Sequence, residues 1–132
     1  MNYNDLLLKL SNLIQLSTKE TSIHIHFNII NDNVIIQSFL LNINGEKKDF
    51  EKIESIWNNE FYQEFLYPFL LIVKEKCNLV ASDVISSTRD DLFITRFITE
   101  NNDLFTIEGL SHDDAYRLLE STRNNQKIQL FE

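Results

Sequence analysis

The sequence is poor in the residues that support covalent or glycine-dependent chemistry. Its 132 residues include one cysteine, one proline and two glycines. The lone cysteine, Cys77, excludes an internal disulfide and is typical of a reducing compartment. Gly45 and Gly109 cannot form a glycine-rich phosphate loop, and no serine lies in a Gly-x-Ser-x-Gly elbow. Because no catalytic or nucleotide-binding motif is present, we expect no enzyme activity and no cofactor.

Long apolar runs and basic clusters are also missing. No stretch approaches the about 18 apolar residues that indicate a membrane span, and Met1–Asp5 lacks the basic region of a signal peptide. We therefore expect a cytoplasmic protein that does not bind membranes. Lysines cluster only at Lys47, Lys48 and Lys52, and this cluster is set among the acidic residues Glu46, Asp49, Glu51 and Glu54. Since phosphate contacts need clustered basic residues, we expect no direct nucleic-acid binding.

Apolar and acidic residues, by contrast, are plentiful. Hydrophobic residues make up 43% of the chain and include ten phenylalanines, which is enough for the core of a single domain over 1–132. Twenty acidic residues against twelve basic ones give a net charge of −8. Such a surface repels nucleic acid and anionic membranes, and it attracts basic proteins.

The spacing of the apolar residues predicts an α+β domain. Leucines and isoleucines three and four apart predict a helix over 4–16, capped by Asn4. Alternation over 23–29 predicts a strand that turns at Asn31–Asn33 and returns over 34–43. Asn44-Gly45 predicts a second turn. The remaining expected elements are a helical segment over 50–76 interrupted at Pro68, with a short strand near 46–51 as an alternative for its start, strands over 79–85, 92–99 and 104–107, a helix from Ser111, and an edge strand over 127–131.

This order, α-β-β-α-β-β-β-α-β, predicts a mainly antiparallel sheet of about five to six strands packed against three to four helices. His24 and His26 lie two apart in a predicted strand, so their side chains share one face. With His112 they would offer three imidazoles to a metal ion. No third ligand or carboxylate follows at motif spacing, so we expect a solvent-facing pair of histidines and no metal site.

The acidic surplus is heaviest in the last third of the chain. If 92–99 and 104–107 form a hairpin, both strands have an end at the same edge of the sheet, and the following helix begins there. We predict that this edge binds a partner, although the same residues could simply be solvated loop and cap residues. The acidic residues expected to converge on the edge are Asp90, Asp91, Glu108, Asp113 and Asp114.

A small acidic protein without catalytic motifs is typical of an immunity protein or antitoxin. Such an inhibitor would block the cationic groove of a nuclease-like toxin, and complementary charge would speed its association. This is the function that the sequence favours. A phage-encoded inhibitor of a host defence nuclease would use the same acidic mimicry.

Two other functions remain open. A dimeric secretion chaperone for an effector protein is also small and acidic, and a first helix followed by a hairpin is similar to its element order. The long helical block over 50–76 and the late strand fit that order less well. A small-molecule domain is suggested only by the strand–Gly109–Leu110–helix step. The sequence does not set the oligomeric state.

Overall fold

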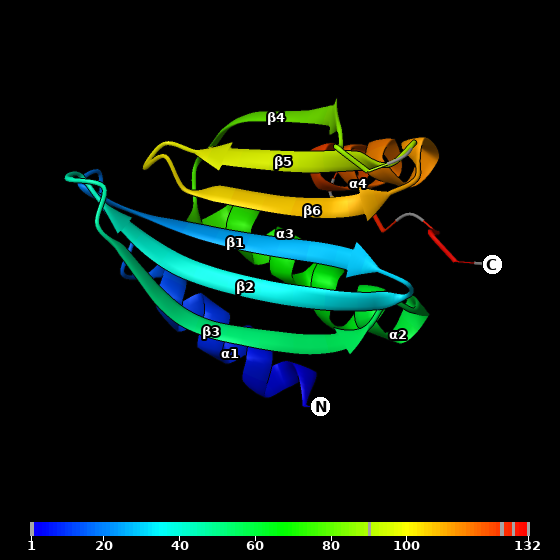
Figure 1. Cartoon of the computed structure of the whole chain (residues 1–132), viewed down its shortest axis with the longest axis horizontal. Helices are drawn as coiled ribbons and strands as arrows, with labels where there is room; N and C mark the ends of the chain where they lie inside the picture. The colour runs from blue at the N-terminus through cyan, green and yellow to red at the C-terminus, as the bar shows by residue number, and fades with distance from the viewer. Residues whose placement is uncertain (1, 90, 125, 128, 132) are drawn as a thin grey trace.

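One six-stranded sheet forms the centre of the molecule, and its described helices pack against a single face (Figure 1). The computed structural model describes residues 2–89, 91–124, 126–127 and 129–131. The strand order is β3-β2-β1-β6-β5-β4, so the α+β class and the mainly antiparallel sheet are confirmed. The elements are α1 (Tyr3–Ile14), β1 (Thr21–Ile30), β2 (Asn33–Asn42), β3 (Lys47–Ile56), α2 (Asn59–Phe61), a π-helical turn (Tyr62–Leu66), α3 (Tyr67–Lys76), β4 (Leu79–Ser86), β5 (Phe93–Thr99), β6 (Leu104–Leu110) and α4 (His112–Asn124).

Helix α1 starts earlier than predicted. Its cap is Asn2 instead of Asn4: the Asn2 side chain accepts a hydrogen bond from the amide of Asp5 at 3.2 Å. That bond satisfies one of the amides left free in a first helical turn. The predicted apolar face is buried against the sheet and the second helical segment, through Leu6, Leu10, Leu13 and Ile14.

The β1–β2 hairpin is confirmed, although its return strand runs over Asn33–Asn42 instead of 34–43. Its antiparallel register runs from Thr21 opposite Asn42 to Ile30 opposite Asn33. Asn31 and Asp32 form the turn with φ values of 48° and 62°, which suit asparagine and aspartate better than branched residues. The side chains of β1 alternate as predicted, and the inward ones, Ile23, Ile25, Phe27 and Ile29, are buried.

Residues 47–56 form a strand, so the helix predicted from Phe50 is wrong and the alternative strand is longer than expected. β3 pairs with β2, but Ser38 lies opposite Glu51 while Phe39 lies opposite Asp49. Phe50 is therefore the extra residue of a β-bulge. A bulge shifts the alternation by one residue. The apolar residues Phe50 and Ile53 are consequently three apart, which imitates helical spacing.

The helical segment over 59–76 is continuous but changes its winding before Pro68. Proline has no N–H to donate to the preceding turn, and the turn before it is π-helical: the amide of Tyr67 donates to the carbonyl of Tyr62. The predicted interruption near Tyr67 is thus a widened turn, with α3 starting at that residue. The rings of Phe65 and Phe69 stack inside the core, 5.8 Å apart.

The second half of the chain builds the other side of the sheet. β5 and β6 form the predicted hairpin, and β4 pairs with β5 at the edge. β6 pairs in parallel with β1, from His24 opposite Leu104 to Asn28 opposite Glu108.

The predicted edge strand over 127–131 is wrong for the described residues of that segment, which form no strand. Instead, Leu130 and Phe131 pack against the core, with the Phe131 ring 5.2 Å from that of Trp57. None of the described helices is long and apolar enough to cross a membrane.

Candidate functional site

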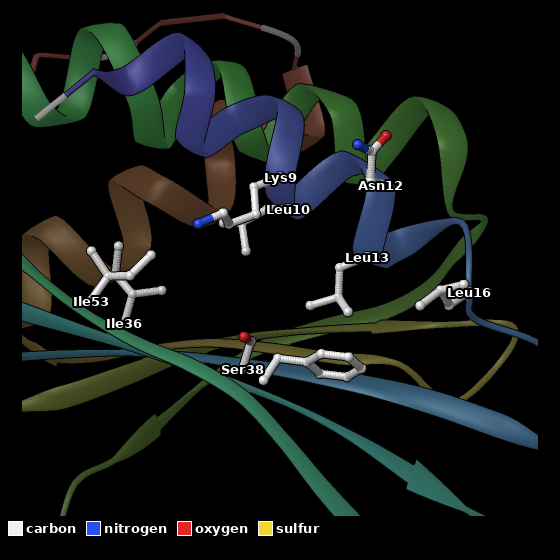
Figure 2. A pocket seen from close by; sticks show the side chains of 9 residues that line it. Lys9, Leu10, Asn12, Leu13, Leu16, Ile36, Ser38 and Ile53 are labelled. Carbon is white, nitrogen blue, oxygen red and sulfur yellow. The ribbon is translucent and has the colours of Figure 1, made fainter.

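An apolar groove runs between α1 and the strands β2 and β3. It has a volume of about 450 Å³, and Figure 2 shows leucines of α1 pointing down toward the sheet. The bulge at Phe50 matters here, since it places that ring among the lining residues. We call this hollow the α1–β3 groove; its lining residues are Lys9, Leu10, Asn12, Leu13, Leu16, Ile36, Ser38, Phe50 and Ile53.

The groove is exposed at its rim and buried at its floor. Leu16 and Phe50 are 53% and 39% exposed, whereas Ile36 and Leu10 are buried. Burying a leucine or phenylalanine side chain against an apolar surface lowers the free energy by about 1.5 to 3 kcal/mol. A partner that covers the rim would therefore gain free energy by association.

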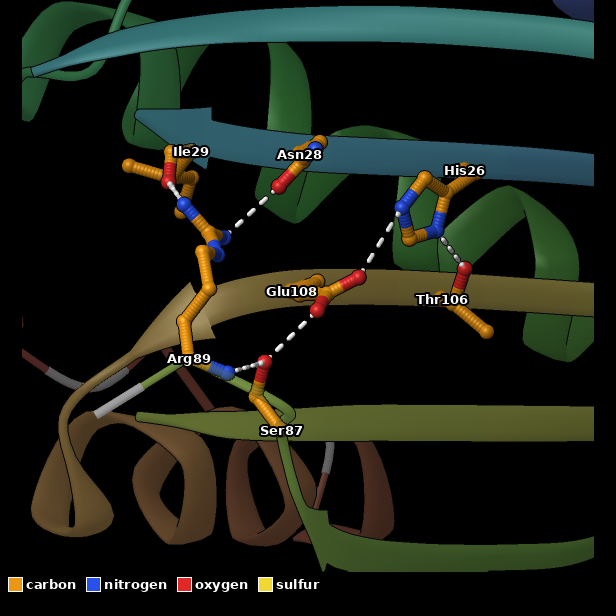
Figure 3. A network of polar contacts seen from close by, with 7 residues as sticks. All are labelled: His26, Asn28, Ile29, Ser87, Arg89, Thr106 and Glu108. Atoms are coloured by element: carbon orange, nitrogen blue, oxygen red, sulfur yellow. Dashed lines mark hydrogen bonds and ion pairs between the residues drawn. The ribbon is translucent and has the colours of Figure 1, made fainter. Parts of the chain in front are cut away.

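A polar network occupies the uncovered face of the sheet. Its centre is Glu108, which accepts a hydrogen bond from the Ser87 hydroxyl at 2.6 Å and lies 3.3 Å from Nε2 of His26. On the other side of the ring, Nδ1 of His26 contacts the Thr106 hydroxyl (Figure 3). A neutral imidazole protonated on Nε2 satisfies both contacts. Burial lowers the pKa of His26, and the charge of Glu108 opposes that shift only in part.

Arg89 extends this network to the end of β1. Its Nη2 donates to the Asn28 side chain at 2.7 Å and its Nη1 to the Ile29 carbonyl at 2.9 Å (Figure 3). The β4–β5 loop is thereby attached to the strand at the centre of the sheet. Arg89 is next to acidic residues in the sequence, and no local sequence pattern predicts its contact with β1.

The histidines lie as predicted, with His24 and His26 on the uncovered face. His24 packs against Phe39, with ring centroids 5.0 Å apart, and burial lowers its pKa. His112 stands at the start of α4 beside Tyr116, at 4.7 Å. Within the described residues, no group of three His, Cys, Asp or Glu side chains could hold a metal ion.

The predicted acidic edge is brought together in part. Asp91 precedes β5, and α4 begins at the same end of the sheet, where Phe93 pairs with Leu110. Asp90 lies outside the described residues. Glu108 is engaged by His26 and Ser87, and Asp114 lies 3.4 Å from Arg117. Asp113 is 79% exposed.

A hollow of about 460 Å³ at this end is lined by residues of both charges. Asp32 and Asp114 line it, but so does Arg89. Trp57 and Gly109 complete part of its wall. The end of the sheet is therefore not a continuous anionic surface.

Two buried residues, Asp103 and Cys77, lie outside these surfaces, and the sequence analysis did not single out Asp103. Asp103 is 1% exposed, and its carboxylate accepts hydrogen bonds from the Ser17 hydroxyl, the Ile23 amide and the Thr99 hydroxyl. It joins the end of α1, the start of β1 and the β5–β6 turn, which is a structural role. Cys77 is buried, and burial raises the pKa of its thiol to about 11, so it is a poor nucleophile.

The fold and these surfaces define an α+β protein with one helix-covered and one uncovered sheet face, an apolar groove and a charged sheet end. Comparison with models of protein families, with curated proteins and with solved structures finds no match to this chain. A functional proposal therefore depends on the surfaces alone.

Proposed function

We propose that this protein binds a segment of another polypeptide, in the manner of a secretion chaperone, and that the α1–β3 groove receives the segment. The observation that carries the proposal is the groove itself. Its leucine, isoleucine and phenylalanine lining suits apolar side chains, and its exposed rim residues would be covered by them. The net charge of −8 favours a partner with a basic surplus.

The order of the elements supports the same proposal. Two features fitted a chaperone poorly: a helical block over 50–76 and a strand over 127–131. The block starts only at Asn59, after the third strand, and the described residues of 127–131 form no strand. The order α-β-β-β-α-β-β-β-α keeps the opening helix and hairpin, and the helical block is shortened to 59–76.

An acidic inhibitor of a basic toxin remains the second candidate. It is favoured by the position of Asp91, Asp113 and Asp114 at one end of the sheet. It is weakened by Arg89, which lies within that end, and by Glu108, whose carboxylate bonds to His26 and Ser87. An inhibitor would recognise the folded cationic surface of its target, whereas a chaperone binds an unfolded segment.

That difference sets the experiment. The proteins encoded beside this chain would be tested for binding both as folded proteins and as overlapping synthetic peptides. We expect peptides with apolar and basic residues to bind, and Leu16→Asp to weaken the affinity about tenfold or more. Leu8→Asp is the matched control, because Leu8 is an exposed leucine of α1, at 62%, and does not line the groove.

The opposite pattern would support the inhibitor. The function would be assigned to the acidic end if only the folded neighbouring protein binds. The triple variant Asp91→Lys, Asp113→Lys, Asp114→Lys should then lose this binding, and Leu16→Asp should keep it. If neither peptides nor folded neighbours bind, the proposal is wrong.

A further inference from the structure

We propose that the protein forms a homodimer in which the β3 strands of two copies pair antiparallel across a twofold axis and join the two sheets. β3 is an edge strand, at the opposite end of the sheet from β4. In the proposed register, Lys47 of one copy lies opposite Glu54 of the other, and Asp49 lies opposite Lys52. The symmetry of the dimer produces each of these pairs twice.

The four charged residues share one face of the sheet. Across the β2–β3 ladder they lie opposite outward residues of β2: Lys47 opposite Leu41, Asp49 opposite Phe39, Lys52 opposite Gln37 and Glu54 opposite Ile35. Residues directly opposite each other in an antiparallel pair point to the same side. All four side chains therefore lie on the face that the helices leave uncovered, where they can meet across the axis.

The bulge at Phe50 makes this register possible. In a regular strand, Lys47 and Glu54 are an odd number of residues apart and would point to opposite faces. The extra residue at Phe50 shifts the alternation between them. In an antiparallel pair of two such strands, outward residues of one copy therefore lie opposite outward residues of the other on both sides of the axis.

Charge also favours this register over its neighbours. A shift of one strand by two residues in one direction places Lys47 opposite Lys52, and a shift in the other direction places Asp49 opposite Glu54. Like charges directly opposite destabilise a strand pair. Charges on an edge strand usually prevent pairing, but here their sequence is complementary to itself. Within one chain, Lys47 lies 3.5 Å from Asp49, and an exposed pair of this kind contributes little stability.

The composition around β3 favours a second copy over other occupants of the edge. The strand contains three lysines and three acidic residues in a chain of net charge −8, so repulsion between copies is small there. Four of the eight large apolar side chains that the described residues leave exposed belong to the residues after α1, the β2–β3 turn and β3. These are Leu16, Ile43, Phe50 and Ile56.

The other edge of the sheet lacks this pattern. β4 contains a single charged residue, Asp83, and Arg96 already bonds its carboxylate at 2.6 Å. A β4–β4 pair would have no complementary charges to fix its register. Pairing through β3 would also place the two α1–β3 grooves next to each other. The dimer does not require the proposed function, since it is measured without any partner.

The test is the mass of the isolated protein in solution, measured by light scattering and sedimentation. We expect twice the 15.6 kDa of one chain. Asp49→Lys and Lys52→Glu each place like charges opposite each other, so each variant alone should be monomeric. Lys19→Glu, an exposed position outside β3, makes the same charge change as Lys52→Glu and should remain dimeric.

Mixing the two monomeric variants tests the register. In the mixed dimer, the lysine introduced by Asp49→Lys would face the glutamate introduced by Lys52→Glu. The unchanged Lys52 of the first variant would face the unchanged Asp49 of the second, so an equal mixture should recover the dimer mass. That recovery also shows that both variants are folded. A monomeric wild-type protein, a dimer that survives either charge reversal, or a mixture that stays monomeric would overturn the inference.

Discussion

Arg89 fills the space that a side chain at Gly109 would need. A Cβ added to Gly109 would lie 2.7 Å from Nη2 of Arg89 and 2.4 Å from the carbonyl oxygen of Ile29. The same guanidinium bonds that carbonyl and the Asn28 side chain. Gly109 also has a φ of +99°, a conformation that side chains disfavour. Because residue 109 has no side chain, Arg89 has room to attach the β4–β5 loop to β1.

Gly109→Ala should lower the free energy of unfolding by about 2 to 3 kcal/mol, because it combines backbone strain with a clash against backbone atoms. Gly45→Ala is the matched control. Gly45 has a φ of +81° but no atom within 4 Å of an added Cβ, so we expect a loss of only about 1 kcal/mol. Urea denaturation measures both. Equal losses would show that the contact with Ile29 and Arg89 does not matter.

Acidification should destabilise the protein through the histidines of the uncovered face. Burial holds the pKa values of His24 and His26 below their ordinary value of 6.5. The unfolded chain therefore takes up protons at a higher pH than the folded one, and stability falls as the pH is lowered through 6.5. Urea denaturation between about pH 7.5 and pH 5.5, above the range where most carboxylates titrate, measures the slope.

The variant His24→Gln, His26→Gln should show a smaller decrease in stability over that range. His112→Gln provides the control for replacing a histidine elsewhere, since His112 is 61% exposed at the start of α4. If His112→Gln reduces the slope as much as the double substitution does, the pH dependence does not come from the uncovered face.

Asp103→Ala should cost about 3 kcal/mol of stability, because it leaves the buried amide of Ile23 without an acceptor. Asp103→Asn should cost less, since one oxygen remains to accept that bond. Thermal and urea unfolding measure both. Glu100→Gln, in the same turn but exposed and bonded to Asn78, is the control. A loss at Glu100 as large as that at Asp103→Ala would contradict the structural role of Asp103.

Cys77 should react slowly with iodoacetamide in the folded protein. Burial, followed by the negative charge of Asp103, raises the pKa of the thiol to about 11, and the thiolate is the reactive form. We expect labelling about 100-fold slower than in urea-unfolded chain, measured by mass spectrometry. Equal rates in the two states would place Cys77 at the surface.

The sequence predicted the parts of the fold where each residue's environment follows from local alternation. β1 is the clearest case, since Ile23, Ile25 and Ile29 face inward and His24 and His26 outward without interruption. For β3 the sequence favoured a helix, with a short strand near 46–51 only as the alternative, because the bulge at Phe50 replaces the two-residue spacing of a strand with a three-residue spacing. A bulge is set by pairing with β2, which a single segment does not reveal.

The candidate sites also have parts that local sequence patterns predict and parts that they do not. The hairpin predicted over 92–99 and 104–107 correctly placed Asp91, Glu108 and the start of α4 at one end of the sheet. The contact of Arg89 with Ile29 joins residues about sixty positions apart, and no local pattern contains it. The α1–β3 groove likewise needs α1 and β3 side by side, although Leu10 and Leu13 were correctly assigned to the apolar face of the helix.

The parallel pairing of β1 with β6 has a consequence for how the chain folds. It joins the first strand to the last, across about eighty residues, whereas the neighbouring antiparallel strands are joined by short turns. Closing so long a loop costs more entropy than forming either three-stranded half, and contacts distant in sequence slow folding. We therefore expect the halves β1–β2–β3 and β4–β5–β6 to form early and their docking along β1 and β6 to limit the folding rate.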